Sequence, residues 1–434
     1  MESRTQPVIG TGGMFRIKLR VKQLPRIIAK RIAALFVVTL LCNPVHAQST
    51  ASIEGQVNDL HGAMLPGVEI TVVSREMGLR RVAVTDDDGR YQIPALPVGS
   101  YRIEVRAHGF QTQIVESSTL EVGRRVTQNF QLQVGDVSQV VTVTTGNALI
   151  DQSSVSISGM VDPRMVQETP LNGRYFLDLA LRVPGSVTPP QGAFLSAPQR
   201  GLGALGINTG GNREETVNYI VNGITLNNLT FSQVSFQPSI NTIQEFKVDN
   251  STFSAEYGES AGAIVNVATR SGANDFHGEV FEFFRNDALD ARNFFEFNSN
   301  RPAPFKRNQF GGNVGGPIIK KTLFLFFSYE GLRQRQGLNI NSVVLSDAQR
   351  ASVTDPVIAR LVGLIPRANL VDSSGTSRFI GSVSAPVHVD QWTTDISYNL
   401  SEGDRLHGYY AIQDAETNEP TRTGNTIPGF GNAV

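Results

Sequence analysis

Apolar and polar residues alternate strictly near the end of this 434-residue chain. On an extended strand over 391–400, one face would carry Trp392, Thr394, Ile396, Tyr398 and Leu400, and the other Gln391, Thr393, Asp395, Ser397 and Asn399. Because successive side chains of a strand point to opposite faces, this pattern predicts a strand with one apolar and one polar side. Such a strand belongs either to the edge of a soluble sandwich or to the wall of a membrane barrel, whose apolar side faces lipid.

The same pattern recurs in neighbouring segments. After the turn Ser401–Asp404, a second strand would place Leu406, Gly408, Tyr410 and Ile412 opposite Arg405, His407, Tyr409 and Gln413, which predicts a hairpin. Further strands are predicted over 276–285, where Glu282 interrupts the apolar side, and over 323–329. Tyr329, Trp392 and Tyr398 are predicted at strand ends, where aromatic residues of a membrane barrel form an interfacial girdle.

Residues 1–47 have the composition of an export signal. Seven Lys/Arg and no acid lie between Arg16 and Arg31, followed by an apolar run of 11 residues, Ile32–Cys42, and a plausible cleavage site after Ala47. A spanning helix needs ~20 residues, so the run predicts a signal peptide rather than an anchor. Cys42 follows Leu41, where a lipoprotein signal requires a small residue, so lipidation is the less favoured alternative.

Charge and cysteine content exclude several function classes. Without residues 1–47 the chain has 30 Lys/Arg against 38 Asp/Glu, a net charge of −8, which is the opposite of a nucleic-acid binder. Its one cysteine, Cys42, lies in the signal, so the sequence excludes disulfides, Cys-ligated zinc and a Cys nucleophile in the exported chain. Elsewhere no apolar run approaches 18 residues, and no transmembrane helix is predicted.

Residues 51–135 are predicted to form a β-sandwich. Alternating segments over 52–57, 68–72 and 101–105 are separated by turn residues, and about seven short strands fit this length. The acidic run Asp86–Gly89 lacks the later glutamate of a calcium loop and is predicted to be a tight hairpin turn.

The stretches 65–72, 85–91 and 96–110 resemble the carboxypeptidase regulatory-like domain, an accessory module with a transthyretin-like, carbohydrate-binding-like fold. The resemblance implies a scaffold that could bind sugar. It does not imply a peptidase, because the sequence contains neither His-x-x-Glu nor His-Glu-x-x-His, and no metal site is predicted.

The segment 136–146 is rich in β-branched residues and ends at a glycine. It is predicted to be either a final strand or tether, or a docking strand that a partner's sheet edge would accept. Both interpretations remain open on the sequence alone.

Residues 147–272 contain one predicted helix, Arg174–Arg182, and two predicted strands, 217–221 and 264–269. The motif Gly201–Gly206 matches a dinucleotide loop, but no strand precedes it and no helix follows it. Gly258–Gly262 has the spacing of a hydrolase nucleophile elbow around Ser260. The polar residues before it and the alternating residues after it favour a turn between strands, so the chain is predicted not to be an enzyme.

The segments 212–224, 242–248 and above all 257–272 resemble the plug domain of TonB-dependent outer-membrane receptors. In that family a plug fills a large barrel, and a preceding strand, the TonB box, pairs with the periplasmic protein TonB. The resemblance implies TonB contacts at Val137, Val140, Val141, Thr142, Val143 and Thr144. It makes plug candidates of Arg200, Arg213, Asn222, Gly223, Tyr257, Gly258, Ser260 and Gly262. For Arg200 and Arg213, a solvated or structural arginine is the favoured alternative.

Residues 276–295, 308–318 and 329–331 resemble the start of the barrel in Oar-like members of this family. Only 162 residues follow position 272, enough for six to eight strands. Plugged transporters use about 22 strands, so the chain is predicted to be the N-terminal part of a longer receptor or to be completed by another chain.

The predicted fold is therefore mainly β. It comprises a signal peptide (1–47), a transthyretin/Ig-like sandwich (51–135), a linker or TonB box (136–146), an α/β plug (147–272) and the first antiparallel strands of an incomplete transmembrane barrel (273–434).

The predicted function is TonB-energised uptake at the outer membrane of a Gram-negative bacterium. The expected partners are TonB, outer-membrane lipid and an extracellular ligand, which could be a glycan, a siderophore, or a peptide or protein; no cofactor and no nucleic acid are expected. The alternative is a secreted or surface-attached β-sandwich protein for adhesion or carbohydrate binding, without transport.

Overall fold

The structure, a computed structural model, describes residues 50–136, 140–143, 157–187, 206–228, 234–251, 253–254, 257–258, 260–291, 304–402, 404–419 and 432–433. The predicted signal peptide lies outside these residues, as do most of the motif Gly201–Gly206 and the candidates Val137, Thr144 and Arg200. Within the described ranges, no helix has the length and apolar character needed to span a membrane. Strands dominate, which confirms the mainly β fold class.

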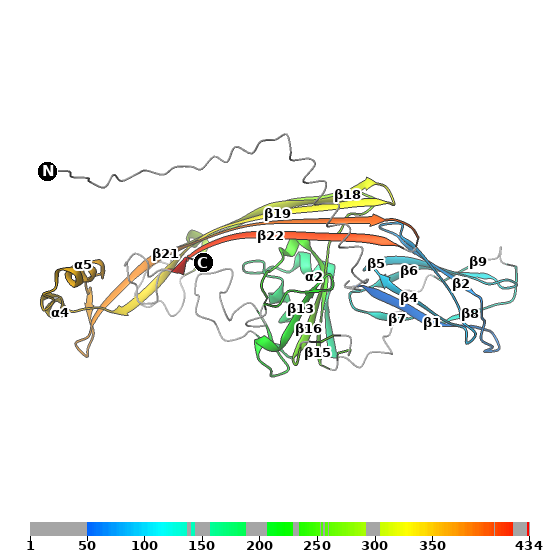
Figure 1. Cartoon of the computed structure of the whole chain (residues 1–434), viewed down its shortest axis with the longest axis horizontal. Helices are drawn as coiled ribbons and strands as arrows, with labels where there is room; N and C mark the ends of the chain where they lie inside the picture. The colour runs from blue at the N-terminus through cyan, green and yellow to red at the C-terminus, as the bar shows by residue number, and fades with distance from the viewer. Residues whose placement is uncertain are drawn as a thin grey trace, which may run out of the picture. The chain divides into compact units, whose positions relative to one another are not determined.

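Residues 51–136 and 140–143 form two packed sheets, called the sandwich below (Figure 1). One sheet contains β4 (Arg90–Leu96), β1 (Ala51–Asp59), β7 (Arg125–Thr127) and β8 (Phe130–Leu132). The other runs in the order β3 (Arg80–Val84), β2 (Glu69–Ser74), β5 (Gly99–Arg106), β6 (Thr112–Leu120) and β9 (Val140–Val143). Both sheets contribute alternate residues to one buried core that includes Ile53, Ile70, Tyr101, Ile103 and Phe130. The predicted β-sandwich is confirmed.

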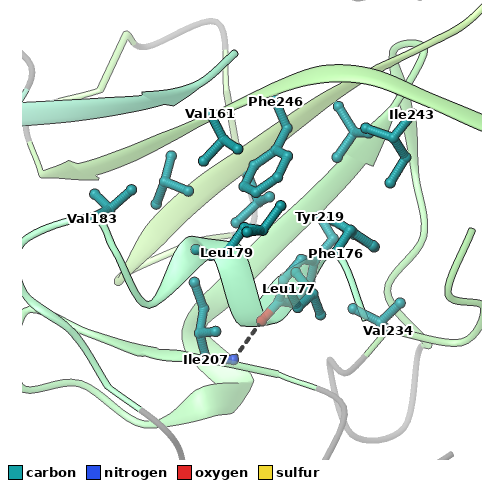
Figure 2. Close-up of a cluster of buried hydrophobic side chains, with 14 of the residues drawn as sticks. Val161, Phe176, Leu177, Leu179, Val183, Ile207, Tyr219, Val234, Ile243 and Phe246 are labelled. Carbon is teal, nitrogen blue, oxygen red and sulfur yellow. Dashed lines mark hydrogen bonds between the residues drawn. The ribbon is translucent and has the colours of Figure 1, made fainter. Parts of the chain in front are cut away.

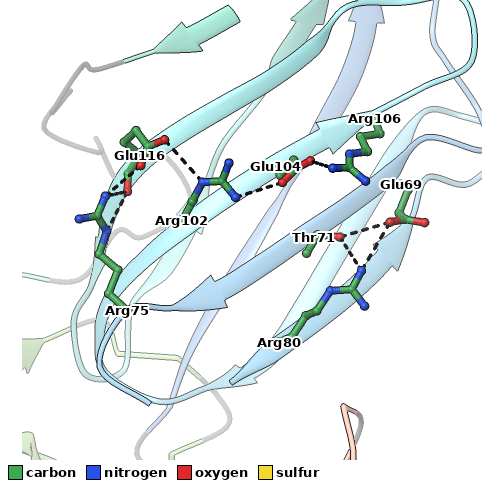
Figure 3. A network of polar contacts seen from close by, with 8 residues as sticks. All are labelled: Glu69, Thr71, Arg75, Arg80, Arg102, Glu104, Arg106 and Glu116. Carbon is green, nitrogen blue, oxygen red and sulfur yellow. Dashed lines mark hydrogen bonds and ion pairs between the residues drawn. The ribbon is translucent and has the colours of Figure 1, made fainter. Parts of the chain in front are cut away.

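The outward side of the second sheet is charged rather than apolar (Figure 3). Arg102 contacts Glu104 at 3.1 Å, and Arg75 contacts Glu116 at 3.1 Å. Exposed ion pairs typically contribute about 0–1 kcal/mol each, so this network marks a solvated face more than a source of stability.

The turn Asp86–Gly89 is tight, but it is not the predicted hairpin. The strands on its two sides, β3 and β4, belong to different sheets, so the turn carries the chain from one sheet to the other. The N–H of Gly89, at φ +68°, donates to the Asp86 carbonyl at 2.9 Å. The Asp86 carboxylate accepts from the backbone N–H groups of Asp88 and Arg90. The acidic run thus stabilises its own turn.

Residues 157–272 are called the middle segment, and their described residues form a third sheet with helices beside it. The sheet order is β10 (Ile157–Val161), β15 (Ile243–Ser251), β16 (Ala263–Thr269), β13 (Val217–Val221) and β14 (Ile224–Thr225). Strands β11 (Ser186–Val187) and β12 (Asn208–Thr209) pair separately. The helices are α2 (Pro163–Glu168) and α3 (Leu177–Ala180), with 3₁₀ turns at Glu214–Thr216 and Ile240–Thr242.

The helices α2 and α3 and the strands around them enclose the core of the middle segment (Figure 2). Phe176 and Phe246 meet edge to face, with ring centroids 5.5 Å apart. The backbone N–H of Ile207 donates to the Tyr219 hydroxyl at 2.9 Å, which satisfies a buried polar group inside this core.

The predicted helix Arg174–Arg182 is much shorter in the structure. Only Leu177–Ala180 are helical, because Arg174 adopts a left-handed conformation, at φ +59°, and the turn before Gly185 follows closely. Helix α2 was not predicted. It begins at an Asp162 cap, whose side chain accepts from the N–H of Met165, and has Pro163 in its first turn.

The third part, called the C-terminal sheet, consists of long antiparallel strands (Figure 1). In sheet order these are β17 (His277–Asn286), β18 (Phe305–Ile319), β19 (Leu323–Val343), β21 (Ser377–Asn399), β22 (Arg405–Glu419) and β23 (Asn432–Ala433), with β20 (Leu370–Val371) pairing with β21. A 3₁₀ turn, Asp287–Leu289, follows β17. The predicted hairpin is confirmed, with Trp392 opposite Ile412 and Tyr398 opposite Leu406. Among the described residues the sheet has two ends and does not close.

The two sides of β21 differ as the alternation predicts. Gln391, Thr393, Asp395 and Ser397 are buried, whereas Trp392, Ile396 and Tyr398 are exposed. This order is the reverse of a soluble sheet, in which apolar residues are buried, and it is the pattern of a barrel wall. The predicted membrane-strand pattern is therefore confirmed.

Other details of the C-terminal sheet differ from the predictions. Strand β19 has 21 residues and β21 has 23, more than twice the ten-residue strands expected. Tyr329 and Trp392 consequently lie within their strands, where their rings are 5.6 Å apart, and only Tyr398 lies near a strand end. Strand β18 was not predicted, and neither were α4 (Asp347–Ala351) and α5 (Pro356–Leu364), which connect β19 with β20.

Candidate functional site

The candidate site lies where side chains of the middle segment contact the buried face of the C-terminal sheet. Two loops of the middle segment take part, 171–175 and 237–241. The guanidinium carbon of Arg174 lies 4.0 Å from the centroid of Phe283 and 5.4 Å from that of Phe281. A cation over an aromatic face contributes about 0.5–2 kcal/mol, depending on its desolvation.

Arg174 also donates to the side-chain oxygen of Asn241 at 2.7 Å. Burial lowers the pKa of Arg174, while the carboxylates of Glu330 and Glu279 raise it. An arginine in this position stays charged at any physiological pH, because its ordinary pKa exceeds 12. The loop 171–175 therefore places a permanent positive charge against aromatic side chains of β17.

Glu330 on β19 collects hydrogen bonds from both parts of the chain. The Ser239 hydroxyl and the Asn241 side-chain amide donate to one carboxylate oxygen, and the Gln309 amide donates to the other at 2.6 Å. Three donors satisfy most of the acceptor capacity of the carboxylate, which offsets the cost of its partial burial.

Gln391 on β21 forms a second bridge. Its side-chain oxygen accepts from the N–H of Ser239 at 2.5 Å, and its amide donates to the Gln237 carbonyl at 2.9 Å and to the Gln413 side chain at 3.0 Å. A small pocket opens beside these groups, and its lining includes Arg174, Gln237, Gln309, Glu330, Gln391 and Gln413. The pocket offers donors, acceptors and one cation, which suits a polar ligand.

None of these contact residues was among the predicted site residues. Glu330 lies in the motif Tyr329–Gly331, which resembles the barrel of the receptor family. Gln391 lies on the polar side of an alternating strand. The sequence therefore contained features that could have pointed to both residues. Ser239 and Arg174 lie in irregular loops of the middle segment, and their partners on the C-terminal sheet are 91 or more residues away in sequence. Sequence patterns of a single strand or helix do not show such pairs.

The described plug candidates lie before and after β13 and just before β16, and none of them lines this pocket. Asn222 and Gly223 have φ values of +49° and +83° and form the two-residue turn between β13 and β14. The Asn222 side chain donates to the Thr269 hydroxyl at 2.7 Å and accepts from the Thr269 N–H. Arg213 is exposed.

The motif around Ser260 packs against β13 and the residues before it. The Ser260 hydroxyl lies 2.7 Å from the Thr216 carbonyl and 2.8 Å from the Ala263 carbonyl. At Gly262, a Cβ atom would meet the Thr216 hydroxyl oxygen at 2.4 Å, so only glycine fits there. Tyr257 receives a hydrogen bond from Asn266 at 3.3 Å, and the Gly258 carbonyl receives one from Asn218. This environment is a packed turn and not a nucleophile elbow.

A buried carboxylate joins the sandwich to the middle segment. Glu245 on β15 is 5% exposed, and its side chain accepts from the N–H of Val122 at 2.6 Å. The pKa of Glu245 is raised to about 7, mainly because the side chain is buried and also because the carboxylates of Glu121 and Asp162 lie nearby; the hydrogen bond from the Val122 N–H opposes this rise in pKa. Glu245 thus titrates near neutral pH at the contact between two parts of the chain.

Of the predicted TonB contacts, Val140–Val143 are described and form β9. The strand pairs in parallel with β6, and Val140 and Val141 are 54% and 41% exposed. Within the described ranges, no group of three or more His, Cys, Asp or Glu residues could hold a metal ion.

Comparisons with known proteins agree with two of these parts. The Carboxypeptidase regulatory-like domain matches residues 52–133, and the Outer membrane beta barrel domain matches residues 268–434. The TonB-dependent transporter Oar of Myxococcus xanthus is 24% identical over 369 residues, which are 82% of this chain and 33% of Oar. The chain therefore spans about a third of the length of this relative.

Two solved structures are among the similar folds. The siderophore receptor PirA of Acinetobacter baumannii aligns with a TM-score of 0.36 and 15% identity, over 65% of this chain and 44% of PirA. The outer membrane transporter YddB of Escherichia coli aligns with a TM-score of 0.43 and 10% identity, over 62% of this chain and 34% of YddB.

Proposed function

We propose that this chain, which is an outer-membrane homologue of the TonB-dependent transporter Oar, forms part of a receptor that imports an extracellular ligand with energy from TonB. In this proposal the middle segment is the plug, the C-terminal sheet is the start of the surrounding barrel, and β9 belongs to the segment that TonB pulls. The chain does no covalent chemistry.

The observation that carries the proposal is the polar contact between the middle segment and the C-terminal sheet. Ser239 and Asn241 bind Glu330, and Ser239 also binds Gln391. The net contribution of such hydrogen bonds is about 1–3 kcal/mol each, with the larger values for bonds to the charged Glu330, because water can replace either partner. A plug held by groups of this kind can shift within a wet lumen without exposing an apolar core.

The pocket beside Arg174 supports a polar ligand. It combines a fixed cation with the amides of Gln309, Gln391 and Gln413, so it could bind hydroxyl, carboxylate or peptide groups. Glycans, siderophores and peptides all offer such groups, and the ligand is proposed only at this level.

The rival function is adhesion or carbohydrate binding without transport. The sandwich alone would suit it, but the exposed apolar side of β21 and β22 would not, since a soluble protein rarely exposes a large contiguous apolar face. Extraction separates the two functions. A receptor requires detergent for release from outer membranes, and recovery in plain buffer would support the rival.

Binding of TonB tests the proposal directly. The chain, produced with its complete reading frame in detergent, is titrated with the purified periplasmic domain of TonB. We expect binding that Val141→Pro weakens at least about tenfold, because proline removes a backbone donor from the docking strand. Val82→Pro, in the edge strand β3 at the other end of the same sheet, is the matched control and should bind normally. Absence of binding by the unmodified protein contradicts the proposal.

A further inference from the structure

The strand proposed to bind TonB already has a partner inside the chain. Strand β9 lies parallel to β6, with Thr112 opposite Val140 and Val115 opposite Val143. It is the last strand of the sheet β3-β2-β5-β6-β9, so within the described residues one edge is paired and the other is open. The backbone groups that a partner's sheet would use on the paired edge are therefore occupied.

The apolar side chains of β9 whose burial is described, Val140 and Val141, are exposed. All four residues, Val140–Val143, are β-branched and favour a strand in any sheet. Val140 and Val141 remain largely exposed, at 54% and 41%, so the pairing buries little apolar surface. Segments with few buried contacts open most readily from a folded domain.

Strand β6 is different, because its own anchoring does not depend on β9. It pairs with β5 on its other edge, and Val115 is only 6% exposed in the core of the sandwich. Loss of β9 would leave the rest of the sheet intact and would uncover only the backbone edge of β6.

TonB could bind β9 in two ways, and these differ in which part of the chain receives the pulling force. If TonB paired with the open edge of β9 while β9 stayed on β6, the force would act on the sandwich. If β9 left β6 first, the force would pass along the covalent chain toward β10, the next described strand, which pairs with β15 in the middle segment. Only the second way delivers force to the middle segment.

We propose that β9 exchanges between two mutually exclusive partners, strand β6 of the sandwich at rest and the sheet edge of TonB when engaged. The sandwich therefore competes with TonB for one strand. This inference rests on the proposed function, since it names TonB as the second partner.

A disulfide between β6 and β9 tests the exchange. Thr112 and Val140 are registered opposite each other, so Thr112→Cys with Val140→Cys can form a disulfide between β6 and β9. The chain after residue 47 has no other cysteine, so no competing disulfide can form. The matched control is Glu69→Cys with Val84→Cys, which joins registered residues of β2 and β3 at the opposite edge. Affinity for the periplasmic domain of TonB is measured for each variant, oxidised and reduced.

We expect the oxidised β6–β9 variant to bind at least about tenfold more weakly than its reduced form, and the control to bind equally in both forms. Equal affinity of the oxidised and reduced β6–β9 variant overturns the exchange but leaves the proposed function standing. Absence of TonB binding in every protein, including the unmodified one, overturns both.

Hydrogen exchange gives a second measurement that needs no disulfide. When TonB is added to the unmodified protein, the amides of Thr112–Val115 that face β9 should exchange faster, because their partner strand has left. Unchanged or slower exchange in β6, with TonB bound, means that TonB adds to the open edge, and this result overturns the exchange.

Discussion

The guanidinium carbon of Arg174 lies 4.0 Å from the centroid of Phe283, so an irregular loop of the middle segment is joined to the first strand of the C-terminal sheet. Arg174 has a φ of +59°, a conformation that costs a residue with a Cβ about 1–2 kcal/mol. Its contacts with Phe283 and Asn241 offset this strain. The contact between Arg174 and Phe283 is therefore present only while this loop of the middle segment is bound to the C-terminal sheet.

Phe283→Leu should loosen this loop, because leucine retains apolar bulk but has no aromatic face for the cation. A loss of about 1 kcal/mol corresponds to roughly fivefold more frequent local opening. Trypsin cleavage after Arg174 in outer-membrane preparations should accelerate by that factor. Phe284→Leu is the matched control, since Phe284 lies on the other side of β17 and is 65% exposed. Equal cleavage rates in both variants would show that the ring contact contributes nothing.

Glu245 should make the stability of the protein depend on pH. Its pKa is raised from 4.5 to about 7 in the fold, so between these values the folded protein keeps a proton that the unfolded chain has lost. Stability therefore falls as the pH rises through this window, by an amount on the order of 3 kcal/mol.

Glu245→Gln should remove this dependence, since glutamine does not titrate but still offers an oxygen to the Val122 N–H. Thermal unfolding followed between about pH 5 and pH 8 should show a falling midpoint for the unmodified protein and a flatter profile for the variant. Parallel profiles would mean that Glu245 is ionised throughout in the folded protein.

Ser260→Ala should affect stability and not catalysis. The Ser260 hydroxyl serves two backbone carbonyls, and the carbonyl of Thr216 also accepts from the Gly262 N–H at 2.9 Å. Removing the hydroxyl should therefore cost only about 1 kcal/mol. Chemical denaturation measures this loss, and a chromogenic ester tests for hydrolysis. An esterase activity that disappears in the variant would restore the nucleophile hypothesis.

Local patterns predicted the parts of the fold that depend on neighbouring residues. The strand predicted over 217–221 coincides with β13, because a run of β-branched and aromatic residues ends at an Asn-Gly turn. The alternation over 391–413 predicted that β21 has one apolar and one polar side, and the folded structure was needed to show that the polar side is the buried one. The helix beginning at Arg174 was predicted too long, since its first residues turn away to contact β17.

The candidate site was less predictable, for a physical reason. Its contacts join Ser239 to Glu330 and Gln391, residues separated by 91 and 152 positions, and each partner is an ordinary polar residue in its own segment. Strand β18 was missed because glycines and Pro317 interrupt its pattern, although its backbone pairs along most of its length with β17 and β19. Such pairs become visible only when the sheet is formed.

The orientation of β22 allows a stringent test of the membrane wall. Ile412 is 46% exposed opposite Trp392, whereas the adjacent Gln413 points to the other side and accepts a hydrogen bond from Gln391. A charge on the lipid side of a barrel costs about 2–4 kcal/mol near the bilayer centre, but a charge on the lumen side meets water and polar groups. Ile412→Arg should therefore reduce the amount of heat-modifiable, folded protein in the outer membrane, while Gln413→Arg should assemble normally and disturb only the contact with Gln391. If both arginine variants assembled equally well, the exposed apolar side of β22 would not face lipid, and the interpretation of the C-terminal sheet as a membrane wall would fail.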